Sequence, residues 1–261
     1  MSRLRAAFER AAAENRAALV AYLTFGDPAL RTSIEAVVAA ARAGADVIEL
    51  GVPFSDPSAD GPSIQAAMER ALAAGATLAG ALAAVAELRA KGEGVAIVLF
   101  GYYNPIFALG VATFAERAAA AGIDAVLTVD LPLDELAELA SPLAARGVEV
   151  VPLVAPTSTP DRIARLAGFV PPFVYYISMT GVTGSRAAAA VDPVRLAQIR
   201  LAAGAPVAVG FGIRTAADAA RFSSIADGVV VGSALVDRLA ADGVAGVAAL
   251  VGELAGAMPR R

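Results

Sequence analysis

The residues best suited to chemistry in this chain lie in one segment, residues 49–62, which reads Glu-Leu-Gly-Val-Pro-Phe-Ser-Asp-Pro-Ser-Ala-Asp-Gly-Pro. Glu49 ends a short apolar run, and the stiff loop after it carries Asp56 and Asp60. An acidic surface turn is the alternative interpretation. However, side chains alternate along a strand, so Glu49 shares a face with Val47. In a closed barrel that face is the interior, where an ionised carboxylate is costly without a partner or a use.

The composition limits which other groups could take part. The 261 residues include no histidine and no cysteine, and Lys91 is the only lysine. A Ser-His-Asp triad, a metal site built on imidazole or thiolate, a cysteine nucleophile and a disulfide are therefore excluded. Lys91 lies in a Gly-rich turn, which disfavours a Schiff base. Proton transfer is left to carboxylates and tyrosines, and no metal site is predicted.

Charge and hydropathy narrow the class of protein. Acids and bases are interspersed and the net charge is −4, so no basic patch indicates nucleic acid or an anionic membrane. The mean hydropathy is +0.65, but the longest uncharged stretches, 94–115 and 166–185, contain prolines and several glycines. Neither predicts a clean spanning helix. The N-terminus carries Glu9 and Glu14 and lacks the apolar core of a signal peptide, so we expect a cytoplasmic protein.

The elements that must position Glu49 follow one repeated pattern: an Ala-rich amphipathic segment, a glycine, then a short β-branched run. The glycines fit helix C-termini, where a positive φ is needed, and the continuous apolar runs are typical of parallel strands covered on both faces. The glycines are Gly44, Gly94, Gly122, Gly147, Gly168, Gly204 and Gly228. The predicted strands span 19–24, 47–50, 95–99, 125–129, 148–154, 173–177, 207–209 and 229–231.

Eight β–α alternations in a chain of this length predict a (β/α)8 TIM barrel, as a single domain over residues 1–261. A polar helix at about residues 2–17 is expected to cap the barrel base. An open doubly wound sheet is the competing architecture, but no Gly-x-Gly-x-x-Gly fingerprint follows the first strand. In a barrel, Asp46 and Asp124 fall at strand starts, on the face that serves stability. For Asp27, a turn or N-cap role is sufficient.

Three Gly-rich turns follow the last three predicted strands, at residues 181–185, 210–213 and 232–234. Each alone is a weak signal, because βα turns need glycine for backbone reasons. Together they fall where barrels build phosphate sites, from the last loops and a helix N-terminus. Backbone N–H groups and the Ser233 hydroxyl can hold a dianion without any basic side chain. The sequence therefore predicts a phosphate site.

These motifs together resemble the tryptophan synthase alpha chain family. The segment 49–62 is the most specific of them, and the others run in the family's order from residue 20 to about 236. They are Thr24-Phe-Gly-Asp-Pro28, Tyr102-Tyr-Asn-Pro-Ile106, Asp130-Leu-Pro132, Gly181-Val-Thr-Gly184, Gly210-Phe-Gly-Ile213 and Gly232-Ser-Ala234. The resemblance implies a (β/α)8 barrel and a carbon–carbon lyase of tryptophan biosynthesis. Its reaction would be the retro-aldol cleavage of indole-3-glycerol phosphate to indole and glyceraldehyde 3-phosphate.

The resemblance also implies roles for single residues. Glu49 would protonate C3 of the indole and help move the glycerol proton, Asp60 would hold the indole N–H, and Tyr175 would orient Glu49 or the glycerol chain. A carboxyl inside an apolar barrel should have a raised pKa, whereas a loop carboxylate should stay charged. The implied substrate-binding residues are Tyr22, Phe100, Tyr102, Val129, Leu153 and Thr183. The implied phosphate-binding residues are Gly184, Phe211, Gly212, Gly232 and Ser233.

The resemblance implies no cofactor in this chain, because the protonated indole is itself the electron sink. It implies docking onto a β subunit that carries pyridoxal phosphate, in an αββα assembly that channels indole. Pro53, Asp56, Pro57 and Asn104 lie in stiff loops suited to that interface, since such loops lose little entropy on docking. Docking should close the loop carrying Asp60 and raise cleavage.

Some positions depart from the family pattern: Tyr22 stands where phenylalanine is usual, Ser58 replaces an aliphatic residue, and Phe100-Gly101 is an unusual pair. Three alternatives stay open. One is a free-standing indole-3-glycerol-phosphate lyase, another is a different phosphosugar barrel such as an isomerase, and the third is a catalytically weak regulatory partner subunit. The paired carboxylates argue against the isomerase, and the glycines argue against loss of catalysis.

Overall fold

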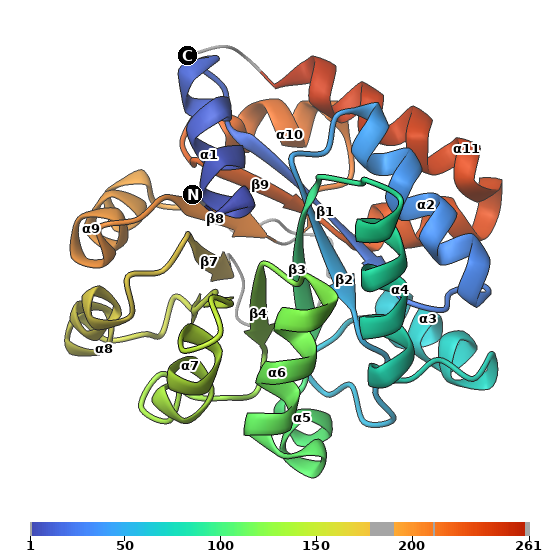
Figure 1. The fold of residues 1–261 in the computed structure, drawn as a ribbon. Coiled ribbons are helices and arrows are strands. Elements are labelled where there is room, and N and C mark those ends of the chain that lie inside the picture. Colours follow the sequence, from blue (N-terminus) through green and yellow to red (C-terminus); the bar gives the residue numbers. More distant parts are fainter. Residues whose placement is uncertain (1, 178–190, 211, 259–261) are drawn as a thin grey trace.

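The computed structural model describes residues 2–177, 191–210 and 212–258 (Figure 1). The β-branched apolar runs form parallel strands, which pair in the order β5-β4-β3-β2-β1-β9-β8-β7-β6. The strands are β1 (Ala18–Thr24), β2 (Val47–Gly51), β3 (Ala96–Gly101), β4 (Ala125–Thr128), β5 (Glu149–Val150), β6 (Leu153–Val154), β7 (Val174–Ile177), β8 (Val207–Gly210) and β9 (Gly228–Val231).

The two ends of this strand order belong to one extended segment, so the sheet closes on itself. β5 and β6 are separated only by Val151 and Pro152. The Val151 N–H donates to the Val126 carbonyl in β4 at 2.9 Å, and the Tyr175 N–H in β7 donates to the Pro152 carbonyl at 3.0 Å. Residues 149–154 therefore act as one barrel strand with a neighbour on each side. The predicted (β/α)8 barrel is confirmed, with its fifth strand interrupted at a proline that has no N–H to offer.

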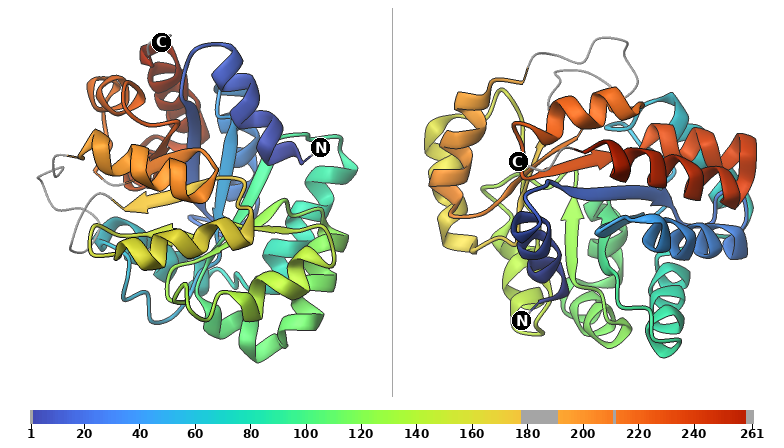
Figure 2. Two further views of the ribbon diagram at one scale, coloured as in Figure 1. Left: turned by 90° about the vertical axis from the view of Figure 1, so that its left-hand side faces the viewer. Right: turned by 90° about the horizontal axis from the view of Figure 1, so that it is seen from above.

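Helices surround the strands on the outside, apart from the first one, which lies across the base of the barrel (Figures 1 and 2). They are α1 (Arg3–Ala13), α2 (Leu30–Ala43), α3 (Pro62–Ala73), α4 (Leu78–Ala90), α5 (Tyr103–Leu109), α6 (Val111–Ala121), α7 (Ala137–Ala144), α8 (Pro160–Ala164), the 3-10 helix η1 (Arg165–Phe169), α9 (Pro193–Ala203), α10 (Ala216–Ser223) and α11 (Ser233–Ala257). In the described chain, no single helix is long and apolar enough to span a membrane; α3 and α4 meet that test only as a pair bent by 90°.

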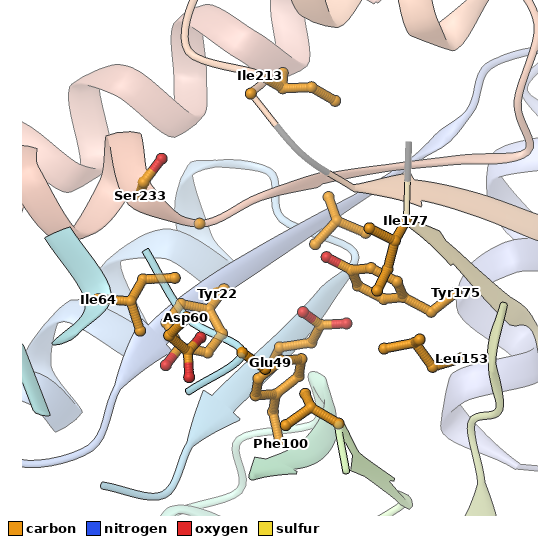
Figure 3. A pocket seen from close by; sticks show the side chains of 15 residues that line it. Tyr22, Glu49, Asp60, Ile64, Phe100, Leu153, Tyr175, Ile177, Ile213 and Ser233 are labelled. Atoms are coloured by element: carbon orange, nitrogen blue, oxygen red, sulfur yellow. The ribbon is translucent and has the colours of Figure 1, made fainter. Parts of the chain in front are cut away.

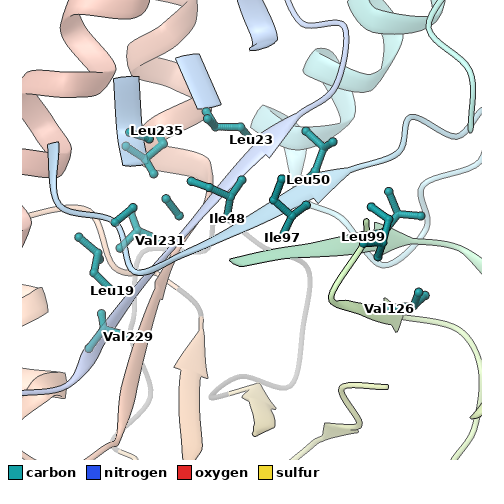
Figure 4. Close-up of a cluster of buried hydrophobic side chains, with 14 of the residues drawn as sticks. Leu19, Leu23, Ile48, Leu50, Ile97, Leu99, Val126, Val229, Val231 and Leu235 are labelled. Atoms are coloured by element: carbon teal, nitrogen blue, oxygen red, sulfur yellow. The ribbon is translucent and has the colours of Figure 1, made fainter. Parts of the chain in front are cut away.

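Alternation along the strands separates two apolar layers. Outward side chains such as Ile48 and Leu50 pack under the helices (Figure 4). Inward side chains such as Val47 form a second cluster inside the barrel. Each fully buried aliphatic side chain contributes roughly 1.5–3 kcal/mol. At the barrel base, the ring of Phe8 from α1 stacks on Phe173 with centroids 4.8 Å apart. These layers fix which strand residues can face the barrel interior.

Two local predictions need correction. Gly44, Gly122, Gly147 and Gly204 have the expected positive φ, whereas Gly94, Gly168 and Gly228 do not. Gly228 is needed for space instead: a Cβ there would lie 3.0 Å from the Phe8 ring. The second correction concerns residues 104 and 105, which lie in the first turn of α5 rather than in a loop. Proline is tolerated there because first-turn N–H groups have no partner within the helix.

Candidate active site

Glu49 lies on the inward face of β2, as alternation predicted, and is fully buried. Neither carboxylate oxygen has a hydrogen-bond partner among the described residues. Burial without compensation penalises the charged form, and it raises the pKa of Glu49 to about 8. The side chain is therefore a carboxylic acid at neutral pH, able to give up a proton to a bound molecule.

The carboxyl of Glu49 opens into a cavity of about 730 Å3, part of which is open to solvent (Figure 3). Its wall is mainly apolar and aromatic, which suits a flat aromatic ligand with few polar atoms. The lining residues are Tyr22, Glu49, Ala59, Asp60, Ile64, Phe100, Val129, Leu153, Tyr175, Ile177, Gly212, Ile213, Val230, Gly232 and Ser233. Residues from distant parts of the sequence, predicted to form one site, thus meet at one cavity.

Asp60 is the second carboxyl on this cavity and is almost completely buried. The Tyr102 hydroxyl donates a hydrogen bond to Asp60 Oδ2 at 2.7 Å and accepts one from the Ala59 N–H at 3.0 Å. Burial raises the pKa of Asp60 to about 6, although the bond from Tyr102 opposes this shift. The expectation of a freely charged loop carboxylate therefore needs correction: Asp60 is ionised only above about pH 6.

Tyr102 itself is not on the cavity wall but behind Asp60, with its ring stacked on Phe54 at 4.9 Å. Gln65 holds the same loop from the other side, because its side-chain amide donates to the Asp60 carbonyl at 2.7 Å. In the structure Tyr102 positions the Asp60 carboxyl, and the direct substrate contact that the resemblance implies stays a prediction.

Tyr22 and Phe100 form the aromatic part of the wall. Their ring centroids are 5.2 Å apart and the rings are nearly perpendicular, an arrangement favoured by aromatic quadrupoles. The Tyr22 hydroxyl accepts a hydrogen bond from Thr24 at 3.3 Å and lies over Gly51, where a Cβ would approach it to 2.3 Å. Tyrosine at position 22 is therefore compatible with the fold because residue 51 is glycine.

Tyr175 is also buried on the wall, but it makes no hydrogen bond to Glu49, whose oxygens are unpaired in the described structure. Its hydroxyl lies over Gly210, where a Cβ would be only 2.0 Å away. Burial, then the charges of Glu49 and Asp60, hold the pKa of Tyr175 well above its ordinary value. The Tyr175 hydroxyl therefore stays protonated and can donate a hydrogen bond into the cavity, but it does not orient Glu49 directly.

The predicted phosphate residues Gly212, Gly232 and Ser233 lie together on the cavity wall. Gly212 has a φ of 71°, which glycine adopts without strain, and Ser233 is the first residue of α11. The N–H groups and dipole at the start of a helix favour an anion. The other predicted residues of this region, Thr183, Gly184 and Phe211, lie outside the described residues.

The predicted interface residues differ in accessibility. Asp56 and Asn104 are exposed, Pro57 is half-buried and Pro53 is buried. Pro53 is therefore unavailable to a partner in this conformation, because the chain folds the start of the loop against its own core. Among the residues that the structure describes, no group of three or more acidic side chains has metal-binding geometry.

Two charged contacts on this face were not foreseen. Asp27 is fully buried and accepts two hydrogen bonds from Arg70, at 2.7 and 3.0 Å. It lies in a turn, where its N–H donates to the Thr24 carbonyl at 3.3 Å, and Ala29 rather than Asp27 is the N-cap of α2. Arg214, two residues after Gly212, donates to the Ser233 hydroxyl at 3.4 Å. Only its position in the loop after β8 hinted at this contact.

Comparisons with known proteins agree with this geometry. The family model described as tryptophan synthase alpha chain matches residues 8–257. The chain is 48% identical over 260 residues to the tryptophan synthase alpha chain of Dechloromonas aromatica, covering 97% of each. It is 50% identical over 241 residues to that of Nitrosococcus oceani, covering 92% of this chain and 89% of the relative.

Solved structures give the same result. A chain of Mycobacterium tuberculosis tryptophan synthase superposes with a TM-score of 0.89 at 41% identity, covering 100% of this chain and 99% of the other. Tryptophan synthase subunit alpha of Legionella pneumophila gives 0.88 at 32% identity, with 98% of each covered. By sequence and structure, the chain belongs to the tryptophan synthase alpha chain family.

Proposed function

We propose that Glu49 and Asp60 are the two carboxylates with which this tryptophan synthase alpha chain cleaves indole-3-glycerol phosphate to indole and glyceraldehyde 3-phosphate. The observation that carries the proposal is that two buried carboxyls line one cavity. Burial raises their pKa values to different levels, about 8 for Glu49 and about 6 for Asp60. Between these values, Glu49 holds a proton and Asp60 holds a charge. Acid–base catalysis by two carboxylates needs this division of roles.

In the proposed reaction, the Glu49 carboxyl donates its proton to C3 of the indole ring, which becomes a cation. The bond between C3 and the glycerol chain then breaks, and its electron pair returns to the ring to restore neutral indole. The adjacent hydroxyl gives its proton to the Glu49 carboxylate as its carbon becomes the aldehyde of glyceraldehyde 3-phosphate. Glu49 thus ends the cycle protonated, as it began.

Asp60 stabilises the intermediate in this scheme. Its negative charge, held in a poorly solvated wall, attracts the ring cation more strongly than it would in water. Its other oxygen can accept the indole N–H, while the hydrogen bond from Tyr102 to Oδ2 fixes the orientation of the carboxylate. The apolar side chains Phe100, Val129 and Leu153 would enclose the ring and exclude water.

The phosphate would bind at the other end of the cavity, against Gly212, Gly232 and Ser233. Gly184 and Phe211 belong to this phosphate site, and Thr183 to the substrate-binding residues, through the family resemblance alone. Tyr175 would donate a hydrogen bond from its hydroxyl to the glycerol chain, because the side chain faces the cavity and stays protonated.

We infer that a β subunit is the partner of this chain, since the similar structures include tryptophan synthase of M. tuberculosis. An αββα stoichiometry, pyridoxal phosphate on the β subunit and a cytoplasmic location stay predictions. The exposed side chains of Asp56 and Asn104 support docking through this face, as does Phe107 on α5, which is 65% exposed.

The proposal is tested by measuring indole release from indole-3-glycerol phosphate across pH, with the chain alone and with a β subunit added. We expect kcat/KM to rise with an apparent pKa near 6 and fall with one near 8, because activity needs ionised Asp60 and protonated Glu49. Asp60→Asn should remove the acidic limb. A profile flat from pH 5 to 9 would contradict the paired assignment, and fast cleavage unchanged by any β subunit would favour the free-standing lyase.

A further inference from the structure

A guanidinium group lies beside the proposed phosphate site, although the sequence suggested a site without basic side chains. Arg214 Nη1 donates to the Ser233 hydroxyl at 3.4 Å, and Nη2 donates to Asp237 Oδ2 at 2.6 Å. We propose that Arg214 binds the substrate phosphate directly. While the site is empty, the guanidinium of Arg214 pairs with Asp237 instead. This inference rests on the proposed function, because it adds a ligand to the phosphate site of that proposal.

The backbone of Arg214 is fixed in place, so only its side chain has to move. Its N–H donates to the Asp218 carboxylate at 3.1 Å. The same carboxylate accepts from the N–H of Thr215, in a capping box that starts α10. Arg214 therefore has a rigid base two residues beyond Gly212, which lines the cavity.

The ion pair between Arg214 and Asp237 is weak enough to break when phosphate binds. The side chains of Arg214 and Asp237 are 49% and 40% exposed, and an exposed ion pair contributes little to stability. A phosphate dianion offers Arg214 two parallel charge-assisted hydrogen bonds, which are stronger than those to one carboxylate oxygen. Exchange of Asp237 for phosphate is therefore favourable.

Asp237 keeps a cationic neighbour after the exchange. Arg70, which holds Asp27 in a paired contact, lies close enough that the negative charge of Asp237 helps to raise its pKa. When Arg214 turns to the phosphate, the charge of Asp237 stays within electrostatic range of Arg70. The proposed exchange thus leaves no carboxylate without a counter-charge nearby.

This arrangement predicts opposite effects for the two members of the ion pair. Arg214→Gln should weaken phosphate binding, because it removes a ligand and exposes the anion to Asp237. Asp237→Ala should strengthen phosphate binding, because it frees the guanidinium and removes a repelling charge. If the ion pair only stabilised the start of α11, both substitutions would shift KM in the same direction.

The experiment measures kcat, KM and the inhibition constant for inorganic phosphate, at low and constant ionic strength because exposed charges are screened by salt. For Arg214→Gln, we expect KM and the phosphate inhibition constant to rise roughly tenfold, the usual effect of losing one hydrogen bond to a charged group, with kcat within about twofold. Asp237→Ala should lower both constants, and Arg214→Lys should keep part of the affinity.

Arg238 and Asp242 provide the matched control. They form an ion pair of similar exposure, 48% and 49%, which begins one residue after Asp237 on α11. Arg238→Gln and Asp242→Ala should leave KM and phosphate inhibition unchanged. An unchanged phosphate inhibition constant in Arg214→Gln, or equal shifts in Arg214→Gln and Asp237→Ala, would overturn the inference.

Ser233→Asp separates this inference from the proposal beneath it. If Ser233→Asp raises KM strongly while Arg214→Gln does nothing, the phosphate site stands and Arg214 is not a ligand. If Ser233→Asp also has no effect, the phosphate binds elsewhere and the proposed site itself fails.

Discussion

The carboxylates at the two ends of the barrel differ in their hydrogen-bond partners. At the amino ends of the strands, Asp46, Asp124 and Asp227 each accept a backbone N–H, from Leu19, Ile97 and Val207, at 2.9, 2.8 and 2.9 Å. Each also pairs with an arginine. At the carboxyl ends, Glu49 has no hydrogen bond and Asp60 has only a tyrosine hydroxyl, among the described side chains. Partners, rather than depth of burial, separate the structural acids from the two carboxyls that we propose to be catalytic.

The amino-end contacts form a repeated clamp between strands. The N–H of Asp46 donates back to the carbonyl of Leu19 at 2.9 Å, so this pair of residues is bonded in both directions. The other two aspartates repeat the geometry with Ile97 and Val207. The arginines come from the segment before the partner strand: Arg16 before β1, Arg89 in α4 and Arg200 in α9. Such a clamp fixes the register of neighbouring strands and thereby the height of Glu49.

The largest expected effect is the loss of turnover when Glu49, the acid without a hydrogen-bond partner, is replaced. Glu49→Gln keeps the shape of the side chain but removes its proton, so turnover should fall by roughly 10²–10⁴-fold, the usual contribution of a general acid–base group. Indole release in the steady state measures it. Glu87→Gln, which changes an exposed acid on α4, should have no effect. Turnover of Glu49→Gln within a few-fold of the unmodified chain would show that an unpaired buried acid is not a reliable sign of chemistry here.

A large effect of the other kind is expected at the amino ends. Asp124→Ala removes the counter-charge of Arg89, whose side chain is 14% exposed, and leaves the Ile97 N–H without its acceptor. Breaking a buried ion pair costs about 3–5 kcal/mol of unfolding free energy. Urea unfolding at pH 7 measures this loss, and Asp242→Ala provides an exposed pair for comparison. The kcat of the folded fraction should stay within about twofold, and a fall like that of Glu49→Gln would erase the distinction between the two faces.

The strands could be predicted from the sequence, whereas the contacts of the loop that carries Asp60 could not. The strands and the inward direction of Glu49 follow from apolar runs and from a period of two, both of which are local. The contact between Tyr102 and Asp60 joins residues 42 positions apart and depends on how the loop folds back. No local pattern carries that information, and for this reason the buried state of Asp60 and its raised pKa were not expected.

The phosphate region shows the same limit. Gly212, Gly232 and Ser233 could be predicted, because their positions after the last strands place their backbones. Arg214 could not, since reaching Ser233 depends on side-chain rotamers. The placement of Asn104 in α5 was missed for a different reason: Asn-Pro reads as a turn, but the first turn of a helix accepts it equally well.

The free energy of unfolding should depend on pH because Glu49 is buried without a hydrogen-bond partner. The folded pKa of Glu49, about 8, lies above its ordinary value of 4.5, so the folded chain keeps a proton that the unfolded chain releases. The stability from this proton is complete below pH 4.5 and is lost as the pH rises through 8, at about 1.4 kcal/mol per pH unit. Glu49→Gln cannot ionise, so its unfolding free energy should exceed that of the unmodified chain increasingly between these values. By pH 7 the change relative to pH 4.5 should reach about 3 kcal/mol. A constant difference across pH would mean that Glu49 is ionised in the folded chain.

The smallest expected effect concerns the one bond that distinguishes Asp60 from Glu49. Tyr102→Phe removes the hydroxyl that lowers the pKa of Asp60, so this pKa should rise above about 6. A hydrogen bond of about 0.5–1.5 kcal/mol corresponds to a shift of up to about one pH unit. The acidic limb of kcat/KM should therefore move to higher pH while the basic limb, set by Glu49, stays in place.

Tyr103→Phe is the matched control, because the Tyr103 hydroxyl donates to the exposed Glu138, at 3.4 Å, rather than to Asp60. A loss of activity in Tyr102→Phe without movement of the acidic limb would mean that another group sets that limb, and Asp60 would then lose its place as the charged partner of Glu49.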